Sequence, residues 1–223
     1  MSRSLIAPFA LALSVLAAPP LAQAADLSIG NFAAGSQNIT FTTSAPNTAL
    51  TETGESGGLA ASTAAMGSFT AFCVDLFQDI NLNQTYTDYT AVPVASHAFA
   101  NANAVSDIGK LFSEGHALTS AQDQAAFQIA LWEISYETTG SYDLSNGSVD
   151  FSGPAATLAL ASSWLTALAN TQDFYTVTVF ESPTHQDLVT ATPAVPEPST
   201  YALMAAGLLA VGFVASRRSA KQV

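Results

Sequence analysis

Cys73 is the residue best suited to covalent chemistry, because it is the only cysteine among the 223 residues. With no second cysteine, the chain has no internal disulfide to form, so Cys73 needs another role. One interpretation is a small buried hydrophobic side chain on a strand, which is the usual environment of a free cysteine. The other is a nucleophile, since a thiolate attacks carbonyl carbon atoms.

Gln128 is the candidate partner of Cys73. It lies in the sequence Phe127-Gln128-Ile129-Ala130-Leu131-Trp132, and on a helix it borders the apolar face one turn before Trp132. A neutral amide in that place is costly unless it is hydrogen-bonded or chemically consumed. Gln128 is therefore interpreted either as a residue that bonds to backbone at the edge of the core or as an acyl donor.

Segments 72–75 and 127–132 together resemble the paired motifs of bacterial thioester domains. In that family an aromatic-Cys segment on a strand faces an apolar-Gln segment with a following Trp on a helix, and the Cys sulfur bonds to the Gln side-chain carbonyl carbon. The resemblance implies a thioester between Cys73 and Gln128, with Phe72, Phe127 and Trp132 shielding it from water. It also implies covalent adhesion to an amine or hydroxyl target, a single event rather than enzymatic turnover.

Two other uses of these residues stay open. Lys110 would form a permanent staple if its amine reacted with Gln128. A cysteine hydrolase would instead pair Cys73 with a histidine, although none of the three histidines lies in a recognisable catalytic motif. Those histidines are His97, His116 and His185.

A calcium loop is the only metal motif suggested by the sequence. Segment 79–83 reads Asp-Ile-Asn-Leu-Asn, but Gln84 occupies the position that needs Gly, and no Glu closes the loop. The alternation of Ile80 and Leu82 with polar residues suits a strand edge better. We therefore expect no metal ligand and no cofactor.

The secondary structure that would position these residues is a mixture of strands and helices. Segments rich in β-branched and aromatic residues predict strands at 37–43, 69–76, 84–90, 174–180 and 187–192. Helices are predicted to begin near Ser106-Asp107, at the capping box of Ser120 and Asp123, and with Pro154 at the first helical position. The first of them ends at Gly115.

The arrangement predicted from these elements is an α+β fold, with small β-sheet or barrel-like strands and an inserted helical subdomain. The strands at 69–76 and 84–90 are close enough in sequence to form a hairpin. Residues 25–66 are rich in Ser, Thr, Ala, Gly and Asn and predict short edge strands joined by long loops. The helix at 121–135 is expected to present its apolar residues on one face.

The charge distribution excludes several classes of function. The formal net charge is −12, and the central part of the chain keeps Lys110 as its only Lys or Arg. Such a surface repels nucleic acid and does not bind phosphate through basic side chains. No Gly-rich phosphate loop ending in Lys is present. Nucleic-acid and nucleotide partners are therefore not expected.

The N-terminus has the pattern of a signal peptide. Arg3 supplies a positive region, residues 5–16 an apolar core, and Ala22-Gln23-Ala24 a cleavage site for signal peptidase. Residues 1–24 are therefore predicted to be removed, and residues 25–190 to form the exported thioester-like domain. Residues 191–200, with three prolines, are the predicted linker.

The C-terminus has three parts in a fixed order: the motif Val195-Pro196-Glu197-Pro198, an apolar run at 201–216, and a basic tail at 217–223. This order resembles the PEP-CTERM signal of Gram-negative bacteria, which implies processing by an exosortase-type membrane enzyme. The apolar run is predicted as a single transmembrane helix whose basic end stays in the cytoplasm.

Taken together, the sequence predicts an exported protein, anchored in the membrane by its C-terminal helix before processing and then placed at the cell surface or in the extracellular matrix. A candidate Cys73–Gln128 thioester would attach it covalently to a surface target, as in biofilm adhesion. The alternative is a noncovalent structural protein of the matrix or envelope of an exopolysaccharide-producing Gram-negative bacterium.

Overall fold

A computed structural model of the chain describes residues 23–194 and 202–211. Most of the predicted signal peptide, the Pro-Glu-Pro motif and the basic tail lie outside the described residues. Residues 202–211 are helical and exposed, but the rest of the predicted transmembrane segment is not described. Within the described part, no helix is long and apolar enough to cross a membrane.

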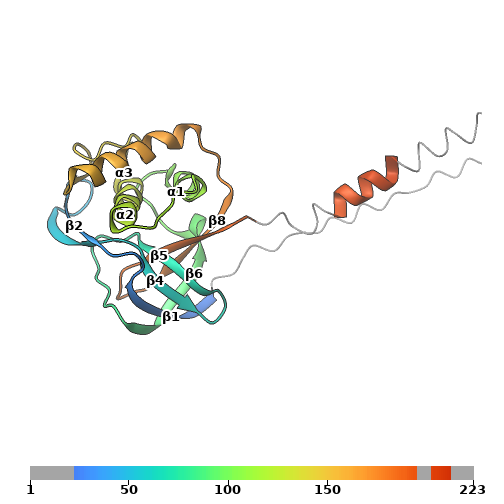
Figure 1. The fold of residues 1–223 in the computed structure, drawn as a ribbon, viewed down its shortest axis with the longest axis horizontal. Helices are drawn as coiled ribbons and strands as arrows, with labels where there is room; N and C mark the ends of the chain where they lie inside the picture. Colours follow the sequence, from blue (N-terminus) through green and yellow to red (C-terminus); the bar gives the residue numbers. More distant parts are fainter. Residues whose placement is uncertain (1–22, 195–201, 212–223) are drawn as a thin grey trace, which may run out of the picture.

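Six antiparallel strands form a closed barrel, which confirms the α+β class and the barrel-like strands (Figure 1). Around the barrel their order is β1-β4-β5-β9-β8-β6. The strands are β1 (Gln23–Phe32), β4 (Leu59–Thr63), β5 (Gly67–Cys73), β6 (Gln84–Pro93), β8 (Tyr175–Glu181) and β9 (Leu188–Pro193). Closure leaves none of these six strands as a free sheet edge.

Two predictions about the strands were wrong. Strands β5 and β6 do not form a hairpin, because β5 pairs with β4 and β9, whereas β6 pairs with β1 and β8. Residues 25–66 contain four strands rather than short edge strands joined by long loops, and two of these strands, β1 and β4, belong to the barrel. Non-local pairing stabilises strands here that their small polar residues do not predict.

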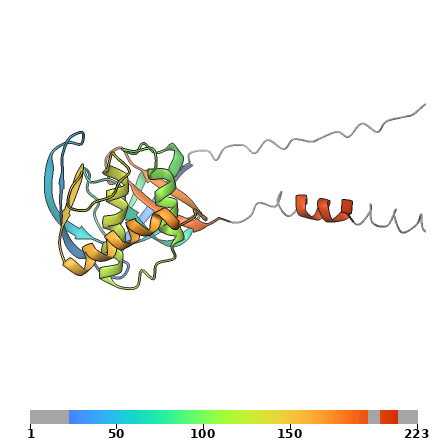
Figure 2. The same cartoon turned by 90° about the horizontal axis from the view of Figure 1, so that it is seen from above.

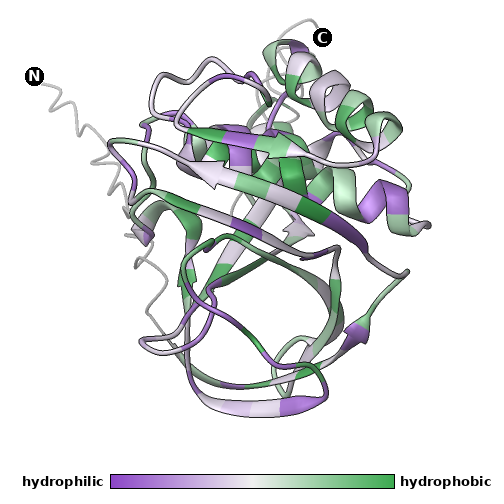
Figure 3. Ribbon diagram, turned by 90° about the vertical axis from the view of Figure 1, so that its left-hand side faces the viewer, coloured by the Kyte–Doolittle hydropathy of each residue, from purple (hydrophilic) through white to green (hydrophobic). Residues whose placement is uncertain are grey.

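A second, three-stranded sheet lies beside the barrel. Its order is β3-β2-β7, formed by β3 (Leu50–Ser56), β2 (Gln37–Thr43) and β7 (Val149–Ser152). Threonine hydroxyls pair across β2 and β3, with Thr40 opposite Thr53 at 2.6 Å and Thr42 opposite Thr51 at 3.1 Å. Figure 3 views the molecule from the side of this sheet.

Two helices flank the central helix. They are α1 (Ala104–Ser113) and α3 (Ala155–Ala167), and short 3-10 turns occur at Val94–Ser96 and Leu168–Asn170. The first helix begins two residues before the predicted Ser106 cap, and it ends just before Gly115, whose φ of 67° suits glycine. Pro154 is the N-cap of α3 rather than its first residue.

The central helix α2 (Ala121–Tyr136) carries the site. Its predicted capping box is present: Ser120 Oγ accepts from the Asp123 N–H, and the Asp123 carboxylate accepts from the Ser120 N–H. The expectation of a single apolar face was wrong, because every residue from Gln124 to Ser135 is buried. The helix lies between α3 and the barrel (Figure 1), with the small sheet against it, so all of its sides face protein.

Candidate functional site

Cys73 is the last residue of β5 and lies at one end of the barrel. On one side it pairs with Leu188 of β9. On the other side the pairing with β4 has already ended at Ala71 and Leu59. The backbone N–H and C=O of Cys73 therefore face a position where the neighbouring strand is absent, and a buried backbone group requires a partner there.

Gln128 fills that position with its side-chain amide. The Cys73 N–H donates to Gln128 Oε1 at 2.9 Å, and Gln128 Nε2 donates to the Cys73 carbonyl oxygen at 2.6 Å. Gln128 is only 1% exposed. The structure thus brings together the two residues of the predicted thioester, which are 55 positions apart in the chain.

Gln124, one helical turn earlier, repeats this arrangement, and sequence reasoning missed it. Its Oε1 accepts from the Gly58 and Ala34 N–H groups at 3.2 and 3.3 Å, and its Nε2 donates to the Leu118 carbonyl at 3.1 Å. The signal available in the sequence was the spacing of four residues before Gln128. Gln128 docks α2 on the end of β5, and Gln124 docks it on the turns next to β1 and β4.

Trp132 is the third member of this helical row. It is 5% exposed and packs against two aromatic rings of the small sheet, Phe41 at a centroid distance of 5.9 Å and Phe151 at 6.4 Å. Its indole Nε1 is buried and has no hydrogen-bond partner in the described part of the chain. Trp132 lies beside Cys73 and Gln128 around a common cavity.

The other two residues predicted to shield the bond lie in an aromatic cluster. Phe72 and Phe127 are 1% exposed, with ring centroids 4.5 Å apart, and Phe112 packs against both. They flank Cys73 and Gln128 in sequence and contribute to the core between the barrel and the helices. Their shielding role stays a prediction.

A cavity of about 260 Å³ opens beside the two residues. Its apolar walls include Trp132, and three acidic residues lie among its lining residues, Glu52, Glu55 and Asp79. The remaining lining residues come from β1, the small sheet, the turn between β3 and β4, β4, the loop after β5 and the loop before β9: Phe32, Phe41, Gly54, Gly57, Leu59, Leu76, Gln78, Ile80, Leu82 and Gln186. A small molecule or side chain of moderate size fits this space.

Burial governs the ionisation of Cys73. Desolvation, followed by the nearby Asp75 carboxylate, raises the pKa of the Cys73 thiol to about 12. The sulfur is therefore a neutral thiol at physiological pH. Any reaction at this position begins from S–H rather than from a free thiolate.

Lys110 lies away from the pair. Its Nζ donates to Asp107 at 2.7 Å within α1. The side chain of Gln128 bonds the backbone of Cys73 instead. The geometry does not bring the amine to the amide, as a staple would require.

Each histidine faces a carboxylate rather than Cys73. His97 Nδ1 lies 2.8 Å from Glu181, His185 Nδ1 lies 3.0 Å from Asp88, and His116 Nε2 lies 2.6 Å from Glu114. The Cys-His hydrolase alternative gains no support from these positions.

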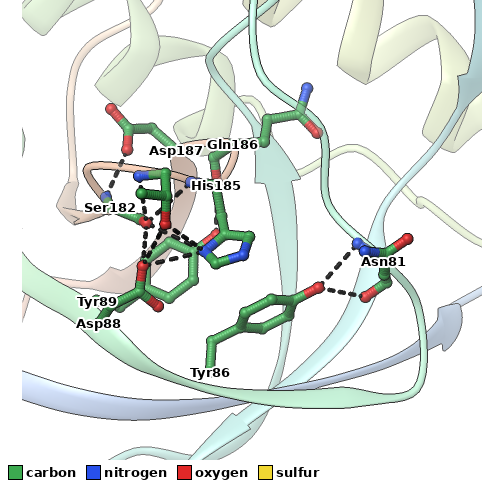
Figure 4. Close-up of polar contacts among 9 residues, drawn as sticks. Asn81, Tyr86, Asp88, Tyr89, Ser182, His185, Gln186 and Asp187 are labelled. Carbon is green, nitrogen blue, oxygen red and sulfur yellow. Dashed lines mark hydrogen bonds and ion pairs between the residues drawn. The ribbon is translucent and has the colours of Figure 1, made fainter.

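Ser182, His185 and Asp88 meet without forming a catalytic triad (Figure 4). Ser182 Oγ donates to Asp88 Oδ2 at 2.6 Å, and His185 Nδ1 contacts the same oxygen at 3.0 Å. A triad needs the imidazole between serine and carboxylate, with its second nitrogen on the hydroxyl. Here both groups converge on the acid, so the cluster ties the loop after β8 to β6.

In segment 79–83, which resembles the start of a calcium loop, the backbone of Asn81 is hydrogen-bonded to Tyr86. Tyr86 Oη donates to the Asn81 carbonyl at 2.9 Å and accepts from the Asn81 N–H at 2.8 Å (Figure 4). No group of three or more His, Cys, Asp or Glu in the described residues is arranged to hold a metal ion.

Comparison with known proteins identifies the C-terminus. Residues 194–218 match the PEP-CTERM protein-sorting motif, which confirms the predicted sorting tail. No curated protein and no solved structure matches the chain. The protein is therefore exported to the cell surface and processed by exosortase. The matched residues include neither Cys73 nor Gln128, so the thioester stays a prediction.

Proposed function

We propose that this exported surface protein carries an internal thioester between Cys73 and Gln128 and uses it for a single covalent attachment. One observation carries the proposal: the Gln128 amide lies on the backbone of Cys73, with two hydrogen bonds at 2.9 and 2.6 Å. Proximity of this kind supplies much of the barrier lowering that attack on an amide needs.

Formation of the bond releases one ammonia. The Cys73 sulfur attacks the Gln128 side-chain carbonyl carbon, the C–N bond breaks, and the S–H proton leaves with the amide nitrogen as NH₃. The Cys73 N–H already donates to Oε1, so it stabilises negative charge that develops on this oxygen during attack. The apolar side chain of Trp132 on the cavity wall and the buried rings of Phe72 and Phe127 in the core limit hydrolysis.

Attachment reverses the role of the sulfur. An amine or hydroxyl that enters the cavity attacks the same carbonyl carbon, its proton passes to Cys73, and the target stays joined to Gln128. The domain offers little competition from its own amines, because Lys110 is its only Lys and is held by Asp107. The protein acts once and is not an enzyme.

A second function is favoured by a specific observation. The Gln128 amide makes hydrogen bonds to both the N–H and the C=O of Cys73, as a neighbouring strand would do. Burial also raises the pKa of the Cys73 thiol to about 12. Both facts suit a noncovalent structural protein of the matrix or envelope, in which Gln128 only docks α2 on the barrel.

Intact mass separates these functions. A thioester makes the purified protein one ammonia lighter than its sequence and observed termini require, whereas Cys73→Ala and Gln128→Ala have full mass. Methylamine adds to the thioester of the wild type, so that its mass then exceeds the sequence mass by one CH₂ group, and it leaves both variants unchanged. Gln124→Ala is the matched control, because it removes the neighbouring glutamine but keeps the ammonia loss.

A wild type of full mass with Cys73 free to alkylation after unfolding overturns the thioester. The protein is measured directly after cold purification at mildly acidic pH, so that hydrolysis does not imitate this result. Hydrolysis of a thioester is recognised separately, because it leaves a Glu at position 128.

A further inference from the structure

Strand β3 has an unpaired edge beside the cavity. It is the outer strand of the sheet β3-β2-β7 and pairs with β2 alone. Among the described residues, no backbone hydrogen bond from turns or loops reaches residues 50–56. An edge of this kind exposes alternate N–H and C=O groups that another extended chain can pair with.

The same strand forms one rim of the cavity. Glu52, Gly54 and Glu55 line it together with Cys73 and Gln128. Gly54 leaves the rim open, because a Cβ atom added there would have no other atom within 4 Å. A chain paired with β3 next to Gly54 therefore has room to direct a side chain toward the Cys73–Gln128 pair.

The charges around the cavity select the partner. Glu52 and Asp79 are acidic, and no Lys, Arg or His lies among the lining residues. Glu55 also lines the cavity, but its side chain lies on the other face of β3, where it accepts from Ser36 Oγ. Lys110, the only Lys or Arg in the described part, is paired with Asp107 in α1. The rim therefore attracts a cationic segment and repels a second copy of this acidic chain.

We propose that an extended basic peptide segment of a partner protein adds to β3 as a fourth strand. Its backbone pairs with the free edge, its cationic side chains lie on the face of β3 that carries Glu52, and the side chain beside Gly54 enters the cavity. Strand addition itself does not require the thioester. Only the transfer of the Gln128 acyl group to the bound segment rests on the proposed function.

Binding is tested first in the full-length Cys73→Ala protein, where no covalent step is available. The probe is an octapeptide of alternating Lys and Thr, and the matched peptide is N-methylated at alternate residues so that one edge loses its N–H donors. We expect the first peptide to protect β3 amides from hydrogen exchange and the second to bind about tenfold more weakly, since several hydrogen bonds are lost.

Three substitutions locate the surface. Gly54→Val fills the open rim and is expected to weaken peptide binding without unfolding the sheet, because its Cβ meets no neighbour. Glu52→Gln keeps the shape and weakens binding through loss of charge. Thr51→Val leaves binding unchanged, because the Thr51 side chain pairs with Thr42 on the other face.

The outcomes distinguish the two proposals. Equal binding of both peptides, or unchanged exchange at β3, overturns strand addition even if wild-type protein loses ammonia and reacts with methylamine. Self-association of the free protein through β3, detected by sedimentation, also overturns it. Protection of β3 by the peptide, together with a wild-type protein of full mass, supports strand addition and overturns the thioester alone.

Discussion

Replacing Glu133 with Gln tests how α2 tolerates a carboxyl group in its buried centre. Glu133 is 0% exposed, its Oε1 accepts from the Asp143 N–H at 2.7 Å, and its Oε2 has no partner among the described residues. Desolvation raises the pKa of Glu133 from 4.5 to about 8; the Asp143 N–H opposes this shift, and nearby carboxylates, first that of Glu137, add to it.

The direction of the pH dependence of stability follows from the number of protons bound in the folded and unfolded states. Between pH 4.5 and 8 the folded protein keeps the Glu133 proton, whereas the unfolded chain has released it, so stability falls as pH rises through this window. At about 1.4 kcal/mol for each pH unit, the difference reaches about 3 kcal/mol at pH 7. Glu133→Gln removes this penalty and should raise the free energy of unfolding by about that amount at pH 7 and hardly at all at pH 4.5.

Urea unfolding of both proteins at a series of pH values measures the difference. Glu137, one turn later, is the matched control, because backbone N–H groups of Ser148, Thr139 and Thr138 outweigh its desolvation and lower its pKa. Glu137→Gln should therefore destabilise the protein at pH 7. Equal stability of wild type and Glu133→Gln across the whole range would refute the reasoning.

Two further predictions concern the docking of α2 and the sorting tail. Gln124→Ala leaves the Gly58 and Ala34 N–H groups without their acceptor, and thermal or urea unfolding should show a loss of about 2 kcal/mol; Gln122→Ala, at a half-buried position of the same helix, should cost much less. Pro196→Ala combined with Pro198→Ala alters the sorting motif within residues 194–218, and the protein should stay with the membrane fraction at its unprocessed mass. Release of this double variant at the wild-type rate would show that processing does not need the prolines.

Local signals in the sequence predicted much of this fold. The Ser120–Asp123 capping box fixes the start of α2 within a few residues, and the alternating segment Gln37–Thr43 coincides with β2. The sorting tail was also readable, since its parts are contiguous. Each of these features is determined by neighbouring residues, which is what a sequence displays directly.

Long-range pairing was harder to predict. The barrel closes because β9 inserts beside β5, and nothing near Phe72 or Cys73 signals Val189 and Leu188 as their partners. The all-round burial of α2 depends likewise on elements from both ends of the domain. The contact between Cys73 and Gln128 was suggested only by a resemblance between short motifs, whereas the role of Gln124 was overlooked although it lies on the same helical row.

The direction of the barrel strands has a mechanical consequence. Strands β1 and β9 begin and end, respectively, on one side of the domain (Figures 1 and 2), whereas Cys73 ends β5 at the opposite end of the barrel. The ten residues of β1 span about 30 Å at roughly 3.3 Å each. A tether at residue 194 would thus hold the cavity away from its point of attachment. Tension between the tether and a captured target would act along β9. It would load the six residue pairs between β9 and β8 at the same time, in shear, rather than separate them one after another.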